Sequence, residues 1–383
     1  MTEVSQAMPA DAPARSSVSP NIIPANSIRW LAGSVLGTAI IWLVSPWLVR
    51  SYVPRVFDDA RQVWVLQPGS DFRWRREGFA TTRIGAHGMM GRRESAVKSA
   101  GVTNRPSDSI ESMTIALWGD SQAEGVCVDD ENKIANLIQA TLGETVDVLP
   151  LARSGDSGWD WVHQMPHVQT NLSVDGHAFV ISELSDLVPL QDQQPESIPG
   201  LNSSMAGFSW VIEFCPDFVV HAGRKVLFDA AGQRRRLRLS VGTSKQIKSS
   251  SSGLVTQDHL RQLDANSNRV DWNRVAQRFD VAESRPVMLF YAPVRPMVMG
   301  NRIELDLPDA SAWRDIARAS DSRGITAMNV IPELVDALRK SVSTSQPFTP
   351  HGFQHGRPGS GHLNEIGNRV IAEIISQQIA ALE

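Results

Sequence analysis

A serine stands where an α/β protein can carry out nucleophilic chemistry. Residues 114–118, TIALW, form a short apolar run that ends in Gly119-Asp120-Ser121, and a helical pattern follows. Open parallel sheets build their active sites at the carboxyl ends of their strands. A serine hydroxyl becomes a strong nucleophile only beside a base and donors for the oxyanion. The pattern therefore predicts Ser121 as a nucleophile.

The same tripeptide occurs a second time, at Gly155-Asp156-Ser157, again after a predicted strand. Ser157 is therefore an alternative nucleophile. We favour Ser121, because choosing Ser157 leaves the strand at 114–118 and its turn without a role.

The best candidate for the base is His362, in the run GSGHLNEIGN just before a strongly amphipathic helical pattern over 364–382. A catalytic histidine needs a partner that orients its ring. No carboxylate occurs between Gly352 and Gly361. Three possibilities stay open: a backbone carbonyl orients His362, an acid elsewhere in the chain does so, or the site is degenerate.

Other candidate groups give weaker signals. His163 and His167 have the i, i+4 spacing of helical metal ligands, but Pro166 separates them and no carboxylate accompanies them, which favours incidental surface histidines. No metal or other cofactor is expected. We interpret His351 and His355 as residues of a solvated loop, and the basic run 234–238 as a solvated face. Cys127 and Cys215 are interpreted as two separate thiols.

The elements that must position these residues alternate between strand and helix. Such alternation predicts an α/β fold with a parallel sheet and helices on both faces. Further strands are predicted at 145–151, 178–182, 287–291 and 325–330, and helices at 132–142, 158–172, 310–322 and 364–382. Pro166 is expected to kink or end the helix at 158–172.

The N-terminal region has a different character. Residues 1–28 are expected to be a disordered tail, and 29–50 a transmembrane helix whose uncharged span, 30–49, has the length that crosses a bilayer. Bulky residues follow the span, which favours an uncleaved anchor over a signal peptide. We expect a single-pass membrane protein with a cytoplasmic N-terminus and a periplasmic or otherwise extracytoplasmic soluble part.

The soluble part begins with a small β-rich segment and linker, 51–112, in which 79–84 reads as a strand. The main domain is predicted over 113–383, with an insertion at 190–285 that interrupts the alternation of strands and helices. A formal net charge of −4 gives no reason to expect nucleic acid as a partner.

The octapeptide GDSQAEGV resembles block one of the SGNH or GDSL hydrolase family. That resemblance implies a three-layer α/β/α sandwich with Ser121 as nucleophile and His362 as base. It also implies an oxyanion hole formed by the amides of Ser121 and Gly155, with Ser185 where the family has asparagine. The family's acid lies three residues before the histidine, where this chain has Gly359.

The resemblance further implies a membrane-anchored serine esterase for acyl esters, with O-acetyl groups on an envelope polysaccharide as the expected substrate. Two alternatives stay open. One is an O-acyltransferase of the same fold, in which a sugar hydroxyl replaces water. The other is an inactive domain that binds glycan or acts as a scaffold.

Overall fold

The computed structural model describes residues 25–92, 112–191, 219, 270–282, 285–299, 302–307, 309–343 and 349–382. The chain divides into two compact units, Met1–Val44 and Ser45–Glu383. Most of the predicted tail, linker and insertion lies outside the described residues, as do the basic run 234–238 and Cys215.

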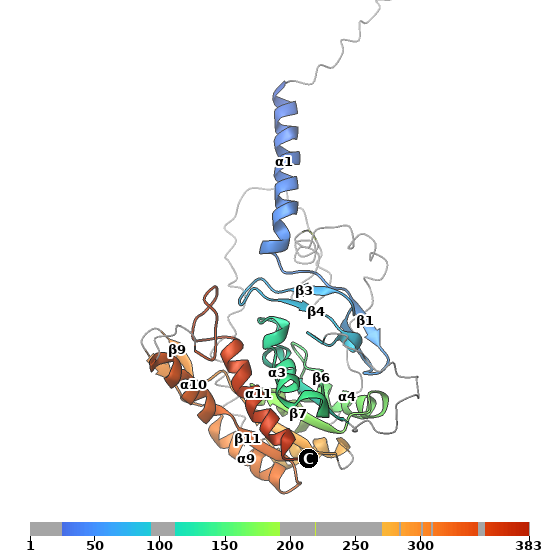
Figure 1. The fold of residues 1–383 in the computed structure, drawn as a ribbon, viewed down its shortest axis with the longest axis vertical. Helices are drawn as coiled ribbons and strands as arrows, with labels where there is room; N and C mark the ends of the chain where they lie inside the picture. Colours follow the sequence, from blue (N-terminus) through green and yellow to red (C-terminus); the bar gives the residue numbers. More distant parts are fainter. Residues whose placement is uncertain are drawn as a thin grey trace, which may run out of the picture. The chain divides into compact units, whose positions relative to one another are not determined.

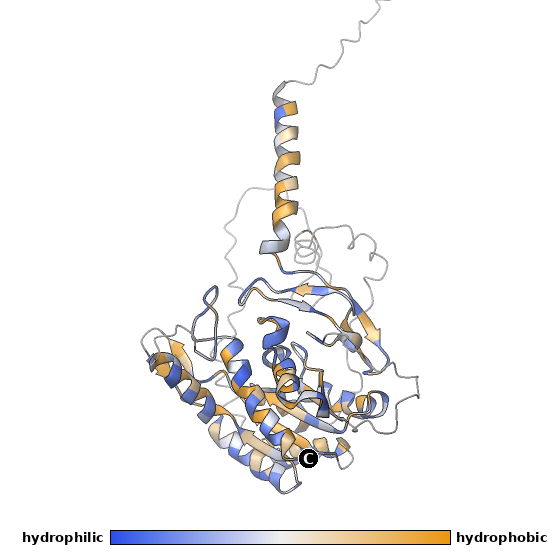
Figure 2. Cartoon of the chain, in the orientation of Figure 1, coloured by the Kyte–Doolittle hydropathy of each residue, from blue (hydrophilic) through white to orange (hydrophobic). Residues whose placement is uncertain are grey.

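The first unit contains most of helix α1 (Ala25–Leu48), whose 24 residues span about 36 Å at 1.5 Å per residue. Figure 2 shows apolar residues along most of its length. Within it, Ser27–Ser45 is long and apolar enough to cross a membrane. Its large apolar side chains are exposed, Trp30 and Leu43 among them. By length and composition α1 fits a membrane anchor, and a signal sequence has the same properties.

The second unit starts with two short antiparallel hairpins, as the β-rich pattern predicted. Strand β1 (Arg55–Asp58) pairs with β2 (Val63–Leu66), and β3 (Asp71–Arg73) pairs with β4 (Thr81–Arg83). Strand β4 is shorter than the predicted strand at 79–84, because Gly78 and Phe79 have positive φ and belong to the hairpin loop. That loop closes where the Trp74 amide donates to the Ala80 carbonyl.

A five-stranded parallel sheet forms the centre of this unit, in the order β11-β8-β7-β5-β6. The strands are β5 (Met113–Gly119), β6 (Val146–Pro150), β7 (Gly176–Ile181), β8 (Val287–Tyr291) and β11 (Thr326–Asn329). Each predicted strand is confirmed to within about two residues. The order places β5 between β6 and β7. Because the three strands are parallel, the loops that follow them leave the same edge of the sheet.

Helices cover both faces of the sheet (Figure 1), which confirms the predicted α/β/α layers. Ala116 and Trp118 of β5 face one core, and Ile115 and Leu117 face the other. The first core is covered by α4 (Gly158–Asn171), α8 (Trp272–Gln277) and α9 (Ala310–Asp321). The second is covered by α3 (Ile134–Leu142) and α11 (Glu365–Ala380), with Leu334 of α10 (Ile331–Ser343).

The helix predicted at 158–172 does not end at its proline. Helix α4 continues through Pro166 to Asn171. Proline removes one backbone hydrogen bond, but Met165 and Val168 on either side are fully buried in the first core. Tertiary packing therefore carries the helix past the residue that was expected to interrupt it.

Candidate active site

Ser121 follows β5 in a turn that requires glycine. A Cβ atom on Gly119, which has φ +150°, would lie 2.6 Å from the Cβ of Ala123 and 2.7 Å from the Val180 carbonyl oxygen of β7. Only a residue without a side chain lets the strand end this close to its neighbour. Ser121 thereby begins the one-turn helix α2 (Ser121–Glu124) at the edge of the sheet.

Asp120 fixes this turn with both of its carboxylate oxygens. One oxygen accepts from the Gln122 amide at 2.8 Å and so caps α2. The other accepts from the Ser182 hydroxyl at 2.7 Å, just after β7. Asp120 thus stabilises the backbone of the nucleophile's turn and ties it to the neighbouring strand.

The structure brings Ser121, His362 and Glu77 together in one hydrogen-bonded chain. The Nε2 atom of His362 lies 3.0 Å from the Ser121 Oγ. Its Nδ1 atom contacts the Glu77 carboxylate directly. The side chains of His362 and Glu77 are 25% and 18% exposed, so substrate can reach a site that is mostly shielded from water. The base lies between the nucleophile and the orienting acid and contacts both, as in the triad of a serine hydrolase.

Glu77 comes from the loop of the β3–β4 hairpin, almost three hundred residues before the base. Two glycines allow it to reach the histidine. A Cβ atom on Gly78 would lie 1.7 Å from the Cys127 carbonyl oxygen, so the loop packs against the backbone near α2. A Cβ on Gly361, which has φ +100°, would lie 3.1 Å from the Glu77 Oε2.

Position 359, three residues before His362, has no room for a carboxylate. A Cβ atom on Gly359, which has φ +80°, would lie 2.6 Å from the Cβ of Val298. Val298 also donates its amide hydrogen to the Gly359 carbonyl oxygen at 2.8 Å. Of the three possibilities left open by the sequence, the geometry favours an acid from elsewhere in the chain.

The charge of Glu77 suits an orienting role. Its hydrogen bond with His362 outweighs partial burial and lowers the pKa of the Glu77 carboxyl. The side chain is therefore ionised at neutral pH and holds Nδ1 in its protonated form, which leaves Nε2 as the acceptor for the Ser121 proton. A carboxylate in this position also stabilises the imidazolium that forms during acyl transfer.

In the described part of the chain, one group of possible metal ligands comes together: Glu77, Cys127 and His362, with ligand atoms within 4.8 Å of one another. Glu77 and His362 already contact each other directly, and a metal between them would have to separate the pair. Burial and the Glu77 carboxylate raise the pKa of the free Cys127 thiol, which keeps it protonated and disfavours metal binding. The arrangement fits a triad better than a metal centre.

The predicted oxyanion residues follow strands that flank β5. Gly155 lies in an exposed turn after β6, and its φ is +85°. In the described residues its amide has no hydrogen-bond partner, so it can donate to an oxyanion. Ser185 lies after β7 in a 3-10 turn, Leu184–Asp186, where its hydroxyl donates to the Glu183 carboxylate at 3.2 Å.

The alternative nucleophile has a structural role. Both the amide and the hydroxyl of Ser157 donate to the Asp160 carboxylate, at 2.8 and 2.9 Å, at the start of α4. These contacts cap the helix. Among the described residues, no histidine forms a hydrogen bond with Ser157.

In the described structure, none of the other histidines that the sequence singled out forms a hydrogen bond with the triad. His163 and His167 pack ring to ring on α4, at 5.5 Å between centroids. His355 is exposed against Phe79, at 5.5 Å. The prediction of a solvated His351 is wrong: it is 1% exposed, because its backbone pairs with Leu363 in the loop behind the base.

Asp186 is a second perturbed acid at this edge. Burial, together with the charges of Asp120 and Glu183, raises the pKa of Asp186 to about 7. A carboxyl whose pKa is raised on folding destabilises the protein above that pKa, and the penalty disappears as the pH falls toward the unfolded value of about 4.

We therefore expect Asp186→Asn to increase the free energy of unfolding at pH 8 by about 1–2 kcal/mol, a value discounted for partial exposure. The gain should shrink below pH 7 and vanish near pH 4, measured by urea unfolding across that range. Asp336→Asn, at an exposed ion pair on α10, is the control and should change stability little at any pH. An equal gain at pH 4 and pH 8 would show that charge is not the cause.

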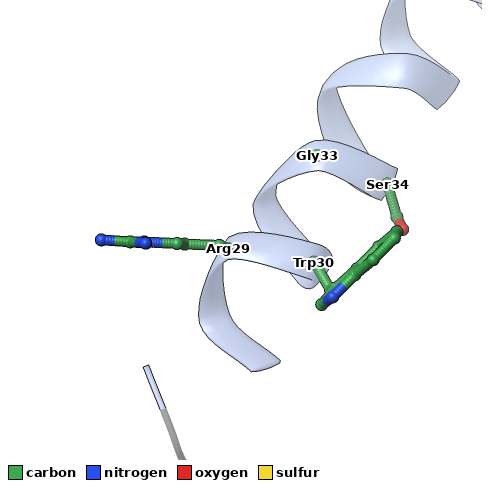
Figure 3. Close-up of a pocket in the computed structure, with 4 residues that line it drawn as sticks. All are labelled: Arg29, Trp30, Gly33 and Ser34. Atoms are coloured by element: carbon green, nitrogen blue, oxygen red, sulfur yellow. The ribbon is translucent and has the colours of Figure 1, made fainter. Parts of the chain in front are cut away.

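A hollow of about 500 Å³ on α1 is lined by Arg29, Trp30, Gly33 and Ser34 (Figure 3). None of these side chains offers a nucleophile paired with a base. The hollow therefore has no part in the chemistry of the triad.

No protein-family profile matches the sequence, and a search of curated proteins finds no match. Solved structures similar to this chain include a lipolytic G-D-S-L family protein from Veillonella parvula, at 12% identity over 70% of this chain and 99% of that one, with a TM-score of 0.35. An extracellular lipase from Streptomyces rimosus has 13% identity, covering 70% and 100%, with a TM-score of 0.37. A carbohydrate acetylesterase from Sinorhizobium meliloti has 10% identity, covering 71% and 100%, with a TM-score of 0.35.

The first of these structures is described as a member of the G-D-S-L family, whose block one the octapeptide resembles, and the other two are a lipase and an acetylesterase. At such identities and TM-scores the likeness assigns neither an activity nor a substrate to this chain. The chemistry of the site has to be inferred from its own geometry.

Glu77 was not among the site residues predicted from the sequence. The pattern that the motifs resemble has its acid beside the histidine, whereas Glu77 lies in the β-rich segment, between Arg76 and Gly78. One signal was present: Glu77 is the only carboxylate between Asp71 and Glu94, and it precedes a glycine in a hairpin loop. Nothing in the sequence says that this loop faces the end of β5.

Proposed function

We propose that this protein is a serine esterase of the SGNH type, anchored in a membrane by α1. The observation that carries the proposal is the chain of contacts from Ser121 through His362 to Glu77. The parallel sheet with the nucleophile at the carboxyl end of β5 supports it, as does the block-one motif.

In the proposed reaction the Ser121 Oγ attacks the ester carbonyl carbon while His362 Nε2 accepts the hydroxyl proton. The tetrahedral intermediate places its negative oxygen near the amides of Ser121 and Gly155. For Ser185 to be a further donor, its hydroxyl must turn away from the Glu183 carboxylate to which it donates in the structure. The intermediate collapses, and His362 gives the proton to the leaving alcohol. Water then attacks the acyl-enzyme with His362 again as base, which releases the acid and restores Ser121.

For the natural substrate we propose acyl esters, with O-acetyl groups on an envelope polysaccharide as the expected class. The family resemblance of the motifs supports this choice, and an anchor at α1 would keep the domain close to such a polymer. The proposal places the soluble part on the extracytoplasmic side of the membrane.

The test uses the full-length protein in detergent with a fluorophosphonate probe and p-nitrophenyl acetate. We expect wild type to be labelled and to hydrolyse the ester, and Ser121→Ala to lose both activities. Ser157→Ala is the matched control, and it should keep both because Ser157 only caps α4, at a cost of about 1 kcal/mol.

Two outcomes would contradict the proposal. Folded wild type that reacts with neither reagent would indicate a binding or scaffold domain. Labelling that survives Ser121→Ala but disappears in Ser157→Ala would show that the wrong serine was chosen.

A further inference from the structure

Two buried polar side chains on α2 have no part in the chemical steps above. Gln122 and Glu124 follow the nucleophile on a single helical turn, and each is only 7% exposed. Burying an amide or a carboxylate carries a desolvation cost that hydrogen bonds must offset. The partners of these two side chains therefore indicate what they stabilise.

Gln122 binds the loop that carries the base. Its Oε1 accepts from the amide of Leu363 at 2.7 Å, and Leu363 directly follows His362. The carbonyl group of His362 shares that peptide plane and accepts from the Gly352 amide at 2.8 Å. The backbone at the base is thus held from two sides, and Gln122 is the link to the nucleophile's own helix.

Glu124 binds the loop that carries the proposed oxyanion donor. Its Oε2 accepts from the Ser154 amide at 2.8 Å and from the Ser154 hydroxyl. Ser154 directly precedes Gly155, whose amide is the donor in question. A carboxylate that holds both groups of Ser154 restricts the peptide that leads into Gly155.

Helix geometry explains how one turn can bind both the loop that carries the base and the loop that carries the oxyanion donor. Successive residues are rotated by about 100° around a helix axis, so positions one and three after Ser121 leave α2 in different directions. One side chain reaches the loop before α11, and the other reaches the loop after β6.

We propose that Gln122 and Glu124 are positioning residues, and that α2 thereby sets both the base and an oxyanion donor relative to the nucleophile. The proposal rests on the proposed esterase function and deepens it. Each side chain is buried and hydrogen-bonded to a backbone amide of the protein, so each acts through the backbone it binds. Displacing a reacting group by about 1 Å can cost roughly 100-fold in rate.

The experiment measures kcat per active site for p-nitrophenyl acetate in the full-length protein, with sites counted by end-point fluorophosphonate labelling. Gln122→Met and Glu124→Met remove the acceptors at similar volume, and each should lower kcat about 10- to 100-fold with little change in KM. Gln122→Glu and Glu124→Gln keep an acceptor oxygen and should restore kcat to within about fivefold of wild type.

Gln169→Met is the matched control, because Gln169 is an equally buried glutamine, on α4, that donates to the Ala282 carbonyl away from the triad. It should reduce the number of labelled sites at most, with kcat per site unchanged. Ser154→Ala removes the hydroxyl contact and keeps the amide contact, so it should lower kcat in the wild-type background by less than Glu124→Met does. It should add nothing in Glu124→Met, where the hydroxyl contact is already lost.

The proposal is overturned if the methionine variants lose labelled sites while the remaining sites keep wild-type kcat, since that is the signature of a purely structural role. It is also overturned if the conservative variants are as slow as the methionine variants. Both outcomes require a labelled, active wild type, so they are distinguishable from a failure of the esterase proposal itself.

Discussion

Replacing Glu77 by glutamine is expected to lower kcat for ester hydrolysis by about 10⁴-fold while leaving the fold intact. Glutamine has nearly the shape of glutamate, but it presents no negative charge to the His362 Nδ1. The imidazolium formed in the transition state then loses its counter-charge, and the ring can adopt the wrong tautomer. The measurement is kcat for p-nitrophenyl acetate, with thermal unfolding recorded on the same sample.

Two further variants sharpen this result. Glu77→Asp keeps the charge but shortens the side chain by one methylene, so its kcat should fall between those of wild type and Glu77→Gln. Asp71→Asn is the control: Asp71 lies in the same hairpin, in an exposed pair with Arg83, and should leave kcat unchanged. Full activity in Glu77→Gln would mean that another group, such as a backbone carbonyl, orients His362.

Replacing Arg61 by methionine is expected to lower the free energy of unfolding by about 3–5 kcal/mol. Arg61 is only 1% exposed and donates to His87 of its own segment, to the Leu151 carbonyl after β6 and to Gln164 of α4, at 2.7–3.0 Å. Burial lowers the pKa of Arg61 to about 10, so the guanidinium is still charged at neutral pH. Methionine fills similar volume but leaves these acceptors buried without a donor.

Urea unfolding of the full-length protein in detergent measures the effect. Arg83→Met is the control, because Arg83 forms an exposed ion pair in the same segment and should change stability by less than about 1 kcal/mol. Because Arg61 attaches the segment that carries Glu77, kcat should also fall before global unfolding. A loss below about 1 kcal/mol for Arg61→Met would show that the β-rich segment is joined to the sheet domain mainly by other contacts.

The strands and helices that position the nucleophile could be predicted because their signals are local. The continuous apolar run of β5 and the amphipathic pattern of α11 depend on residues close in sequence. Ser121 and His362 were found for the same reason, since each lies where a regular element begins. Pro166 shows the limit of such signals: the sequence left open whether the proline kinks or ends the helix, and buried neighbours carry α4 through it.

The sequence by itself determined the parallel α/β fold, the apolar helix at the N-terminus, and the serine and histidine that the structure brings to 3.0 Å. Only the tertiary structure decided the source of the acid. Val298 fills the space that a carboxylate at position 359 would need, and the β3–β4 hairpin brings Glu77 to the vacant side of the imidazole. Contacts between segments so far apart depend on how whole elements dock, and no local pattern of residue types records that arrangement.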